Sequence, residues 1–224
     1  LDAPSVIVAA LLLLLGMFAV AGCAFIKFIY KKKTDLVHLG NSMVIAATWL
    51  LVESKLRQFF FPNSTVAMLM GFLMIAILPY PVLSYVNSIQ NFRYQKVYFT
   101  VALCTAVNYA TVVVLQMLGV KDFFESMTSS HIIIVALILI MAVTIILDIV
   151  KKRIKDYREV AIGFAILMSM GVCEIALVYS INARLNGIFL SIGFISLMIA
   201  AGLKTVRDLF NIEKEKQVAV AASE

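Results

Sequence analysis

The stretch SVIVAALLLLLGMFAVAGCAFIKFIY, residues 5–30, decides the class of fold, and three lysines follow it at residues 31–33. It is longer than the roughly 20 apolar residues that a helix needs to cross the hydrocarbon core of a membrane. A cleaved signal peptide carries its positive charge before the apolar run, whereas here the charge comes after it. The stretch therefore predicts a membrane-spanning helix.

The composition of the whole chain indicates the same class. Hydrophobic residues make up 62% of the sequence, charged residues 14%, and the mean hydropathy is +1.00. Soluble domains are nearer half apolar and a quarter charged. The net charge of +6 comes from basic residues that flank the apolar runs, so we expect lipid and not nucleic acid as the partner.

Six further apolar runs follow the first, and short polar segments separate them. An odd number of spans places the two ends of the chain on opposite sides of the membrane. The seven predicted spans are Ser5–Tyr30, Leu36–Phe61, Thr65–Val86, Val97–Val120, His131–Val150, Val160–Ile181 and Gly187–Leu203.

The basic residues predict the orientation of these spans. If the chain starts outside the cell, 15 of the 19 Lys and Arg residues flank the inner ends of the spans. Only four remain on the outer side: Lys55, Arg57, Lys121 and Arg184. Cytoplasmic loops carry an excess of Lys and Arg. We therefore predict an all-α, seven-helix bundle in the plasma membrane, with an outer N-terminus and a cytoplasmic C-terminus.

Polar residues inside the spans supply the candidate site, because ionisable groups in a membrane are costly and mark function by default. They gather in the outer half of the second, fourth and sixth spans. A pocket that opens outward and binds an extracytoplasmic ligand is one interpretation; hydrogen bonding between helices and snorkelling to the head groups is the other. The candidate ligand-binding residues are Trp49, Glu53, Arg57, Asn108, Glu174 and Arg184.

Three further expectations concern single residues. Pro79 and Pro81 break the hydrogen-bond ladder of the third span, which predicts a kink and a candidate hinge. Asp148 lies beside Lys151 and Lys152 at an inner helix end, which predicts an interfacial ion pair. The two histidines lie at opposite sides of the bundle, so we expect no metal, no cofactor and no catalytic site.

Two segments resemble a known group of proteins. WLLVESKLRQFF at residues 49–60 and LGVKDFFE at residues 118–125 are similar to segments in the seven-helix sensor regions of Firmicute signalling proteins, namely diguanylate cyclases and hybrid histidine kinases. The resemblance covers residues 36–210. It implies an extracytoplasmic domain before Leu1 and a cytoplasmic output domain after Glu224, in agreement with a chain that starts without methionine.

The segment after Leu203 favours one of these outputs. Residues 204–224 lack Gly and Pro and are rich in Lys, Glu, Ala and Val, which predicts a helix that continues into the cytoplasm. Its end, EKQVAVAASE, resembles the linker before the phospho-accepting helix of histidine kinases. We therefore expect a membrane domain at residues 1–203, a signalling-helix linker at 204–224 that forms a homodimer, and a sensor kinase as the parent protein. A diguanylate cyclase and a small-solute transporter are the alternatives.

Overall fold

The computed structural model describes residues 3–31, 34–54, 57–60, 63–179 and 187–221. Over these residues the chain is all-α and contains no strand. Seven of its helical segments are long and apolar enough to cross a membrane. The predicted seven-helix membrane fold is confirmed, and the chain is a multi-pass membrane domain.

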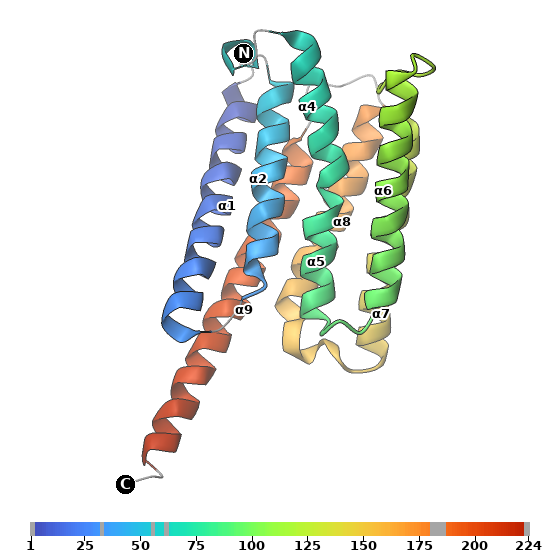
Figure 1. Ribbon diagram of the computed structural model, residues 1–224. Helices are drawn as coiled ribbons and strands as arrows, with labels where there is room; N and C mark the ends of the chain where they lie inside the picture. The colour runs from blue at the N-terminus through green and yellow to red at the C-terminus, as the bar shows by residue number, and fades with distance from the viewer. Residues whose placement is uncertain (1–2, 32–33, 55–56, 61–62, 180–186, 222–224) are drawn as a thin grey trace.

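The part of the chain that is described contains nine α-helices and one short 3₁₀ helix, and all of them except the short helix α3 (Arg57–Phe60) belong to the seven spans (Figure 1). α4 (Ser64–Ile77) and α5 (Pro79–Ile89) form one span, and η1 (Ile154–Tyr157) continues directly into α8 (Arg158–Val178). The elements are α1 (Ala3–Tyr30), α2 (Leu36–Glu53), α3 (Arg57–Phe60), α4 (Ser64–Ile77), α5 (Pro79–Ile89), α6 (Gln95–Met117), α7 (Met127–Val150), η1 (Ile154–Tyr157), α8 (Arg158–Val178) and α9 (Ile188–Ala221).

The helices form a closed ring that includes α2. Neighbours in sequence pack against one another, and α9 returns to contact α1. α2 contacts α1, α4, α5 and α9, and half of its residues are buried, against 22% for the α6 span. We call the end of the bundle where α1 begins the N-terminal face and the opposite end the C-terminal face (Figure 1).

Glycines allow two pairs of helices to approach closely. A β-carbon on Gly16 of α1 would lie 2.8 Å from the carbonyl oxygen of Gly40 on α2. Likewise, a β-carbon on Gly163 of α8 would lie 2.9 Å from Cα of Leu197 on α9. Small residues at such crossings let the two backbones approach closely and increase their van der Waals contact. This contact drives helix association in a membrane, because lipid tails are as apolar as the side chains. The α1–α2 and α8–α9 pairs are therefore fixed along their length.

The outer surface of the ring is apolar. Many large hydrophobic side chains point away from the protein, among them Phe18, Phe28, Met117 and Val150 at 71–85% exposure. In water such continuous apolar surface would drive aggregation. Along a membrane span the same side chains contact acyl chains, so the exposure agrees with the predicted lipid partner.

The predicted end of the second span is wrong. This span was expected to run to Phe61, but α2 ends at Glu53 because the chain becomes extended at Ser54 and only a short helix, α3, follows. At the seventh span, α9 continues past Leu203 as a single helix of 34 residues through Ala221. The chain after Leu203 is thus helical, as the sequence predicts.

Candidate functional site

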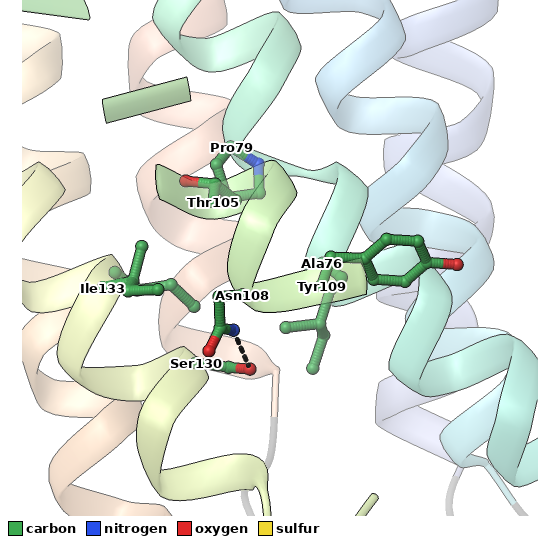
Figure 2. Close-up of a pocket in the computed structure, with 9 residues that line it drawn as sticks. Ala76, Pro79, Thr105, Asn108, Tyr109, Ser130 and Ile133 are labelled. Atoms are coloured by element: carbon green, nitrogen blue, oxygen red, sulfur yellow. Dashed lines mark hydrogen bonds between the residues drawn. The ribbon is translucent and has the colours of Figure 1, made fainter. Parts of the chain in front are cut away.

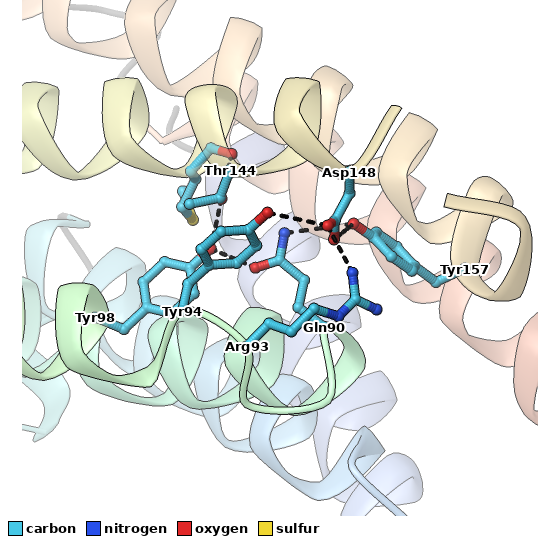
Figure 3. Close-up of polar contacts among 8 residues, drawn as sticks. Gln90, Arg93, Tyr94, Tyr98, Thr144, Asp148 and Tyr157 are labelled. Atoms are coloured by element: carbon cyan, nitrogen blue, oxygen red, sulfur yellow. Dashed lines mark hydrogen bonds and ion pairs between the residues drawn. The ribbon is translucent and has the colours of Figure 1, made fainter. Parts of the chain in front are cut away.

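The most extensive polar cluster lies at the C-terminal face, around Asp148 near the end of α7. Its side chain is fully buried and accepts three hydrogen bonds (Figure 3). Arg93 Nη1 lies 2.6 Å from Oδ1, Tyr94 Oη lies 3.0 Å from Oδ1, and Tyr157 Oη lies 2.6 Å from Oδ2. Three donors satisfy the carboxylate, as a buried charge requires. It therefore ties the α5–α6 turn and η1 to α7.

The cluster continues into the bundle through neutral groups. Tyr157 Oη accepts a hydrogen bond from Gln90 Nε2, and the Gln90 amide oxygen accepts one from Tyr98. Tyr98 Oη also lies 2.7 Å from Thr144 Oγ1 on α7. Gln90 and Tyr157 are fully buried. We call Gln90, Arg93, Tyr94, Tyr98, Thr144, Asp148 and Tyr157 the Asp148 network.

The position of Tyr94 within this network affects its ionisation. Burial, followed by the hydrogen bond to Asp148, raises the pKa of the Tyr94 phenol above its ordinary value. A raised pKa keeps the hydroxyl protonated at neutral pH. Tyr94 therefore remains a hydrogen-bond donor to the carboxylate.

Strained helix ends bring these residues together. α7 ends with a Schellman motif, in which Lys152 N–H binds Ile149 O, Arg153 N–H binds Asp148 O, and Lys152 has φ +57°. α5 ends in the same way, with Asn91 at φ +54°. Glycine usually occupies this left-handed position, and it does so at Gly119 after α6. Backbone strain of this kind concentrates at functional sites.

The partner of Asp148 differs from the sequence-based expectation. An interfacial ion pair with Lys151 or Lys152 was predicted, but the carboxylate pairs with Arg93, 55 positions away in the sequence. Both lysines are exposed. The prediction was wrong because the side chain of Asp148 points into the bundle, whereas the lysines follow the end of the helix.

A polar groove of about 480 Å³ opens beside the network at the C-terminal face. Here Arg207 of α9 forms a 2.6 Å ion pair with Glu159 of α8 and donates to the Asp156 carbonyl oxygen. The groove lies where α9 leaves the bundle, so the Asp148 network and the projecting helix share one surface. The residues that line it include Asp35, Ser88, Asn91, Lys155, Asp156, Lys204, Arg207 and Asn211.

A second polar contact, at the N-terminal face, contains the predicted residue Glu174. Its carboxylate is 6% exposed and accepts hydrogen bonds from the backbone N–H groups of Gly187 and, at 3.2 Å, Leu190. These are donors at the start of α9, which have no acceptor within that helix. A negative charge is also favourable at a helix N-terminus. Glu174 of α8 thus caps α9.

Trp49 lies at the same place. A β-carbon on Gly187 would lie 3.5 Å from Trp49 Cζ3 and only 1.8 Å from Leu50 Cδ2. The start of α9 therefore rests directly on α2, with Glu174 holding its backbone. The structure brings Trp49 and Glu174 together at Gly187, and whether they bind a ligand stays a prediction.

The other predicted ligand-binding residues are more dispersed. Glu53, the last residue of α2, is exposed and its Oε1 points toward Gly71 of α4. Arg57 begins α3, beyond the break at Ser54, so Glu53 and Arg57 do not lie on one continuous helix. Arg184 and Lys55 lie outside the described residues.

Asn108 lies in a separate region with the predicted hinge. Its Nδ2 donates to Ser130 Oγ of α7 at 3.2 Å (Figure 2). Beside them is a cavity of about 20 Å³ that Pro79, Ile75 and Thr105 also line. Such a volume admits about one water molecule. The backbone remains helical at Leu78 (φ −52°, ψ −38°) despite Pro79 and Pro81, and the hinge stays a prediction.

Replacement of Glu174 by Gln tests its role as a cap. The amide has only one acceptor oxygen and no charge, so we expect the free energy of unfolding to fall by about 1–2 kcal/mol. Titration of mixed micelles with dodecyl sulfate, followed by circular dichroism, measures it. Glu213→Gln, an exposed residue of the same helix, is the matched control. Equal effects of the two changes would rule out a capping role.

Comparisons with models of protein families, with curated proteins and with solved structures found no match to this chain. Within the described ranges, no group of three or more His, Cys, Asp or Glu side chains is placed to hold a metal ion. We therefore infer function from the Asp148 network, from the contact between Glu174 and the start of α9, and from α9 itself, which contacts residues at both faces.

Proposed function

We propose that this chain is the transmembrane signal-transducing domain of a bacterial receptor, in which α9 carries a signal from the N-terminal face to an output domain. The observation that supports this is the continuity of α9. Its 34 residues extend for about 51 Å at 1.5 Å per residue, against about 30 Å for a hydrocarbon core. About 20 Å of helix would therefore extend beyond the hydrocarbon core. In Figure 1 the end of α9 projects past the other helices.

The contacts at the two ends of α9 suit transmission. Glu174 and Trp49 hold its start, so a ligand or neighbouring domain that displaces either of them would move the helix. At the other face Arg207 connects it to Glu159. A signal requires two arrangements to which the stimulus binds unequally. Release and re-formation of the Arg207–Glu159 pair is the switch we propose.

The orientation that we propose has the N-terminal face outside the cell. The 15-to-4 excess of Lys and Arg toward the C-terminal face supports it. The stimulus would then reach Glu174 from outside, and the projecting part of α9 would lie in the cytoplasm. A histidine kinase is the preferred output, because residues 215–224 resemble its linker, and a diguanylate cyclase is the alternative.

The part of α9 that leaves the bundle carries an apolar face suited to a second copy of the chain. Leu203, Val206 and Phe210 are 51–70% exposed and are spaced by three and four residues. That spacing aligns them on one stripe, as in a two-stranded coiled coil. Both proposed outputs act as dimers in the family that the sequence resembles, so a homodimer through α9 completes the proposal.

Insertions into α9 test this function. One to four alanines are inserted after Lys214, and the chain is joined to the output part of a histidine kinase that lacks its own sensor. Each residue rotates a helix by about 100°, so autophosphorylation is expected to vary with a period of 3.6 residues. Activity that does not depend on insertion length would contradict transmission through α9.

Two control experiments separate the alternatives. The same insertions are made before a diguanylate cyclase domain. They show whether the periodic variation of activity with insertion length is specific to the kinase. Flux of labelled solutes into liposomes that contain the chain tests transport. Solute flux, together with an output activity that does not vary with insertion length, would favour the transporter.

A further inference from the structure

The turn between α7 and α8 carries a group of five basic side chains on the C-terminal face. Lys151, Lys152, Arg153, Lys155 and Arg158 are all exposed. Among the ion pairs of the described residues, none involves any of these five. We call them the basic turn. Two acidic residues, Asp156 and Glu159, lie in the same stretch, and Glu159 already pairs with Arg207.

The basic turn is held in a fixed shape. Arg153 N–H binds the Asp148 carbonyl oxygen at 2.8 Å, and Tyr157 Oη donates to the Asp148 carboxylate at 2.6 Å. The left-handed backbone at Lys152 completes the turn. Because both ends of the turn are tied to α7, little conformational entropy is lost when a ligand binds, and preorganisation of this kind increases affinity.

Apolar surface lies directly next to these charges. On the last turns of α7, Ile146, Ile149 and Val150 are 51–72% exposed. Ile146, Ile149 and Val150 belong to the candidate span that ends at Val150, and Lys151, Lys152 and Arg153 follow this span directly. We therefore expect the apolar side chains to face acyl chains and the basic side chains after them to face head groups. A phosphate with attached acyl chains matches both surfaces, whereas a free phosphate matches only the charges.

We propose that the basic turn and the exposed end of α7 form a binding site for an anionic phospholipid. The lipid phosphate lies against Lys151, Lys152 and Lys155, and its acyl chains lie along Ile149 and Val150. Since the turn is tied to Asp148, bound lipid stabilises the Asp148 network in its observed arrangement. The composition of the membrane thereby becomes an input to the domain, separate from any signal at the N-terminal face.

The test uses the full chain in detergent micelles, titrated with phosphatidylglycerol, phosphatidylcholine or inorganic phosphate. Native mass spectrometry counts the bound lipid. We expect saturable binding of phosphatidylglycerol and at least tenfold weaker binding of phosphatidylcholine. The triple variant K151Q/K152Q/K155Q is expected to weaken phosphatidylglycerol binding by at least tenfold, since each lysine near an anionic surface contributes roughly a fivefold factor.

The triple variant K27Q/K31Q/K214Q is the matched control. It removes the same number of exposed charges from the same side of the chain, and Lys31, like Lys152, has a positive φ. Its phosphatidylglycerol binding is expected to remain within threefold of the wild type. K151R/K152R/K155R keeps the charge and should bind normally, and circular dichroism verifies that each variant is folded.

Three results would overturn the proposal. Equal losses in the two glutamine variants would mean a diffuse charge effect without a site. Inorganic phosphate that binds at the same concentration as phosphatidylglycerol would mean that the acyl chains contribute nothing. Undiminished binding in K151Q/K152Q/K155Q would place the lipid elsewhere.

Discussion

Replacement of Asp148 by Ala is expected to lower the free energy of unfolding by about 3 kcal/mol. Removal of one partner from a buried ion pair typically costs about 3–5 kcal/mol, because the other charge is left uncompensated. The lower end applies here, since the Arg93 side chain is 24% exposed and its guanidinium can reach water. The loss also includes the O–H donors of Tyr94 and Tyr157, which lose their acceptor.

Unfolding in mixed micelles of increasing dodecyl sulfate content, followed by circular dichroism, measures this change. Asp208→Ala is the matched control: Asp208 forms an ion pair with Lys204 of similar length, 2.6 Å, but its side chain is 39% exposed. An exposed pair of this spacing contributes about 0.2–0.5 kcal/mol. If the two variants unfold at the same detergent composition, the buried network does not stabilise the C-terminal face.

Asp148→Asn separates charge from shape. The amide fits the same space but offers a single acceptor oxygen and no charge, so Arg93 loses its counter-ion while the packing remains. We expect a loss close to that of Asp148→Ala. A variant as stable as the wild type would show that shape rather than charge holds the Asp148 network together.

The number of spans could be predicted from the sequence because a membrane leaves few alternatives. Backbone polar groups must be satisfied within each span, so an apolar run of sufficient length is a helix. The apolar run at residues 5–30 and its counterparts carry that information locally. The exact ends depend on local backbone conformation: α2 stops at Glu53 and not at Phe61, because Ser54 is extended.

The polar clusters were predictable only in part. Glu174 was identified because a carboxylate inside a span is costly, but its role as a cap of α9 depends on a backbone that begins 13 residues later. Arg93, Tyr94 and Gln90 gave no signal, since they lie in or next to a polar connection where such residues are common. Their contact with Asp148 requires the order of helices around the ring, which no local pattern contains.

Gly187 connects these observations, because it is the point at which α2, α8 and α9 meet. Its φ of +84° is one that side chains with a β-carbon rarely adopt, and its N–H binds the Glu174 carboxylate. Leu50 of α2 fills the space next to its Cα. If α9 transmits a signal, the start of the helix must hold this position in at least one of its states.

Gly187→Ala is accordingly expected to lower the free energy of unfolding by about 2–5 kcal/mol. The left-handed backbone costs roughly 1–2 kcal/mol for a residue with a β-carbon, and overpacking of a filled site costs about 1–3 kcal/mol more. The new methyl group would lie 1.8 Å from Leu50 Cδ2, so one of the two groups must move. The same detergent titration measures the change.

Gly202→Ala is the matched control on the same helix. A β-carbon there meets no atom within 4 Å, and Ala favours a helix over Gly by about 1 kcal/mol, so this change should stabilise the chain slightly. The two Gly-to-Ala changes are thus expected to shift the free energy of unfolding in opposite directions. In a Leu50→Ala background the cost of Gly187→Ala should shrink, because the clash is removed and only the backbone strain remains. If Gly187→Ala destabilises the Leu50→Ala variant as much as the wild type, the whole loss of unfolding free energy comes from backbone strain. The contact of α2 with the start of α9 would then have no part in the signal transmission that we propose.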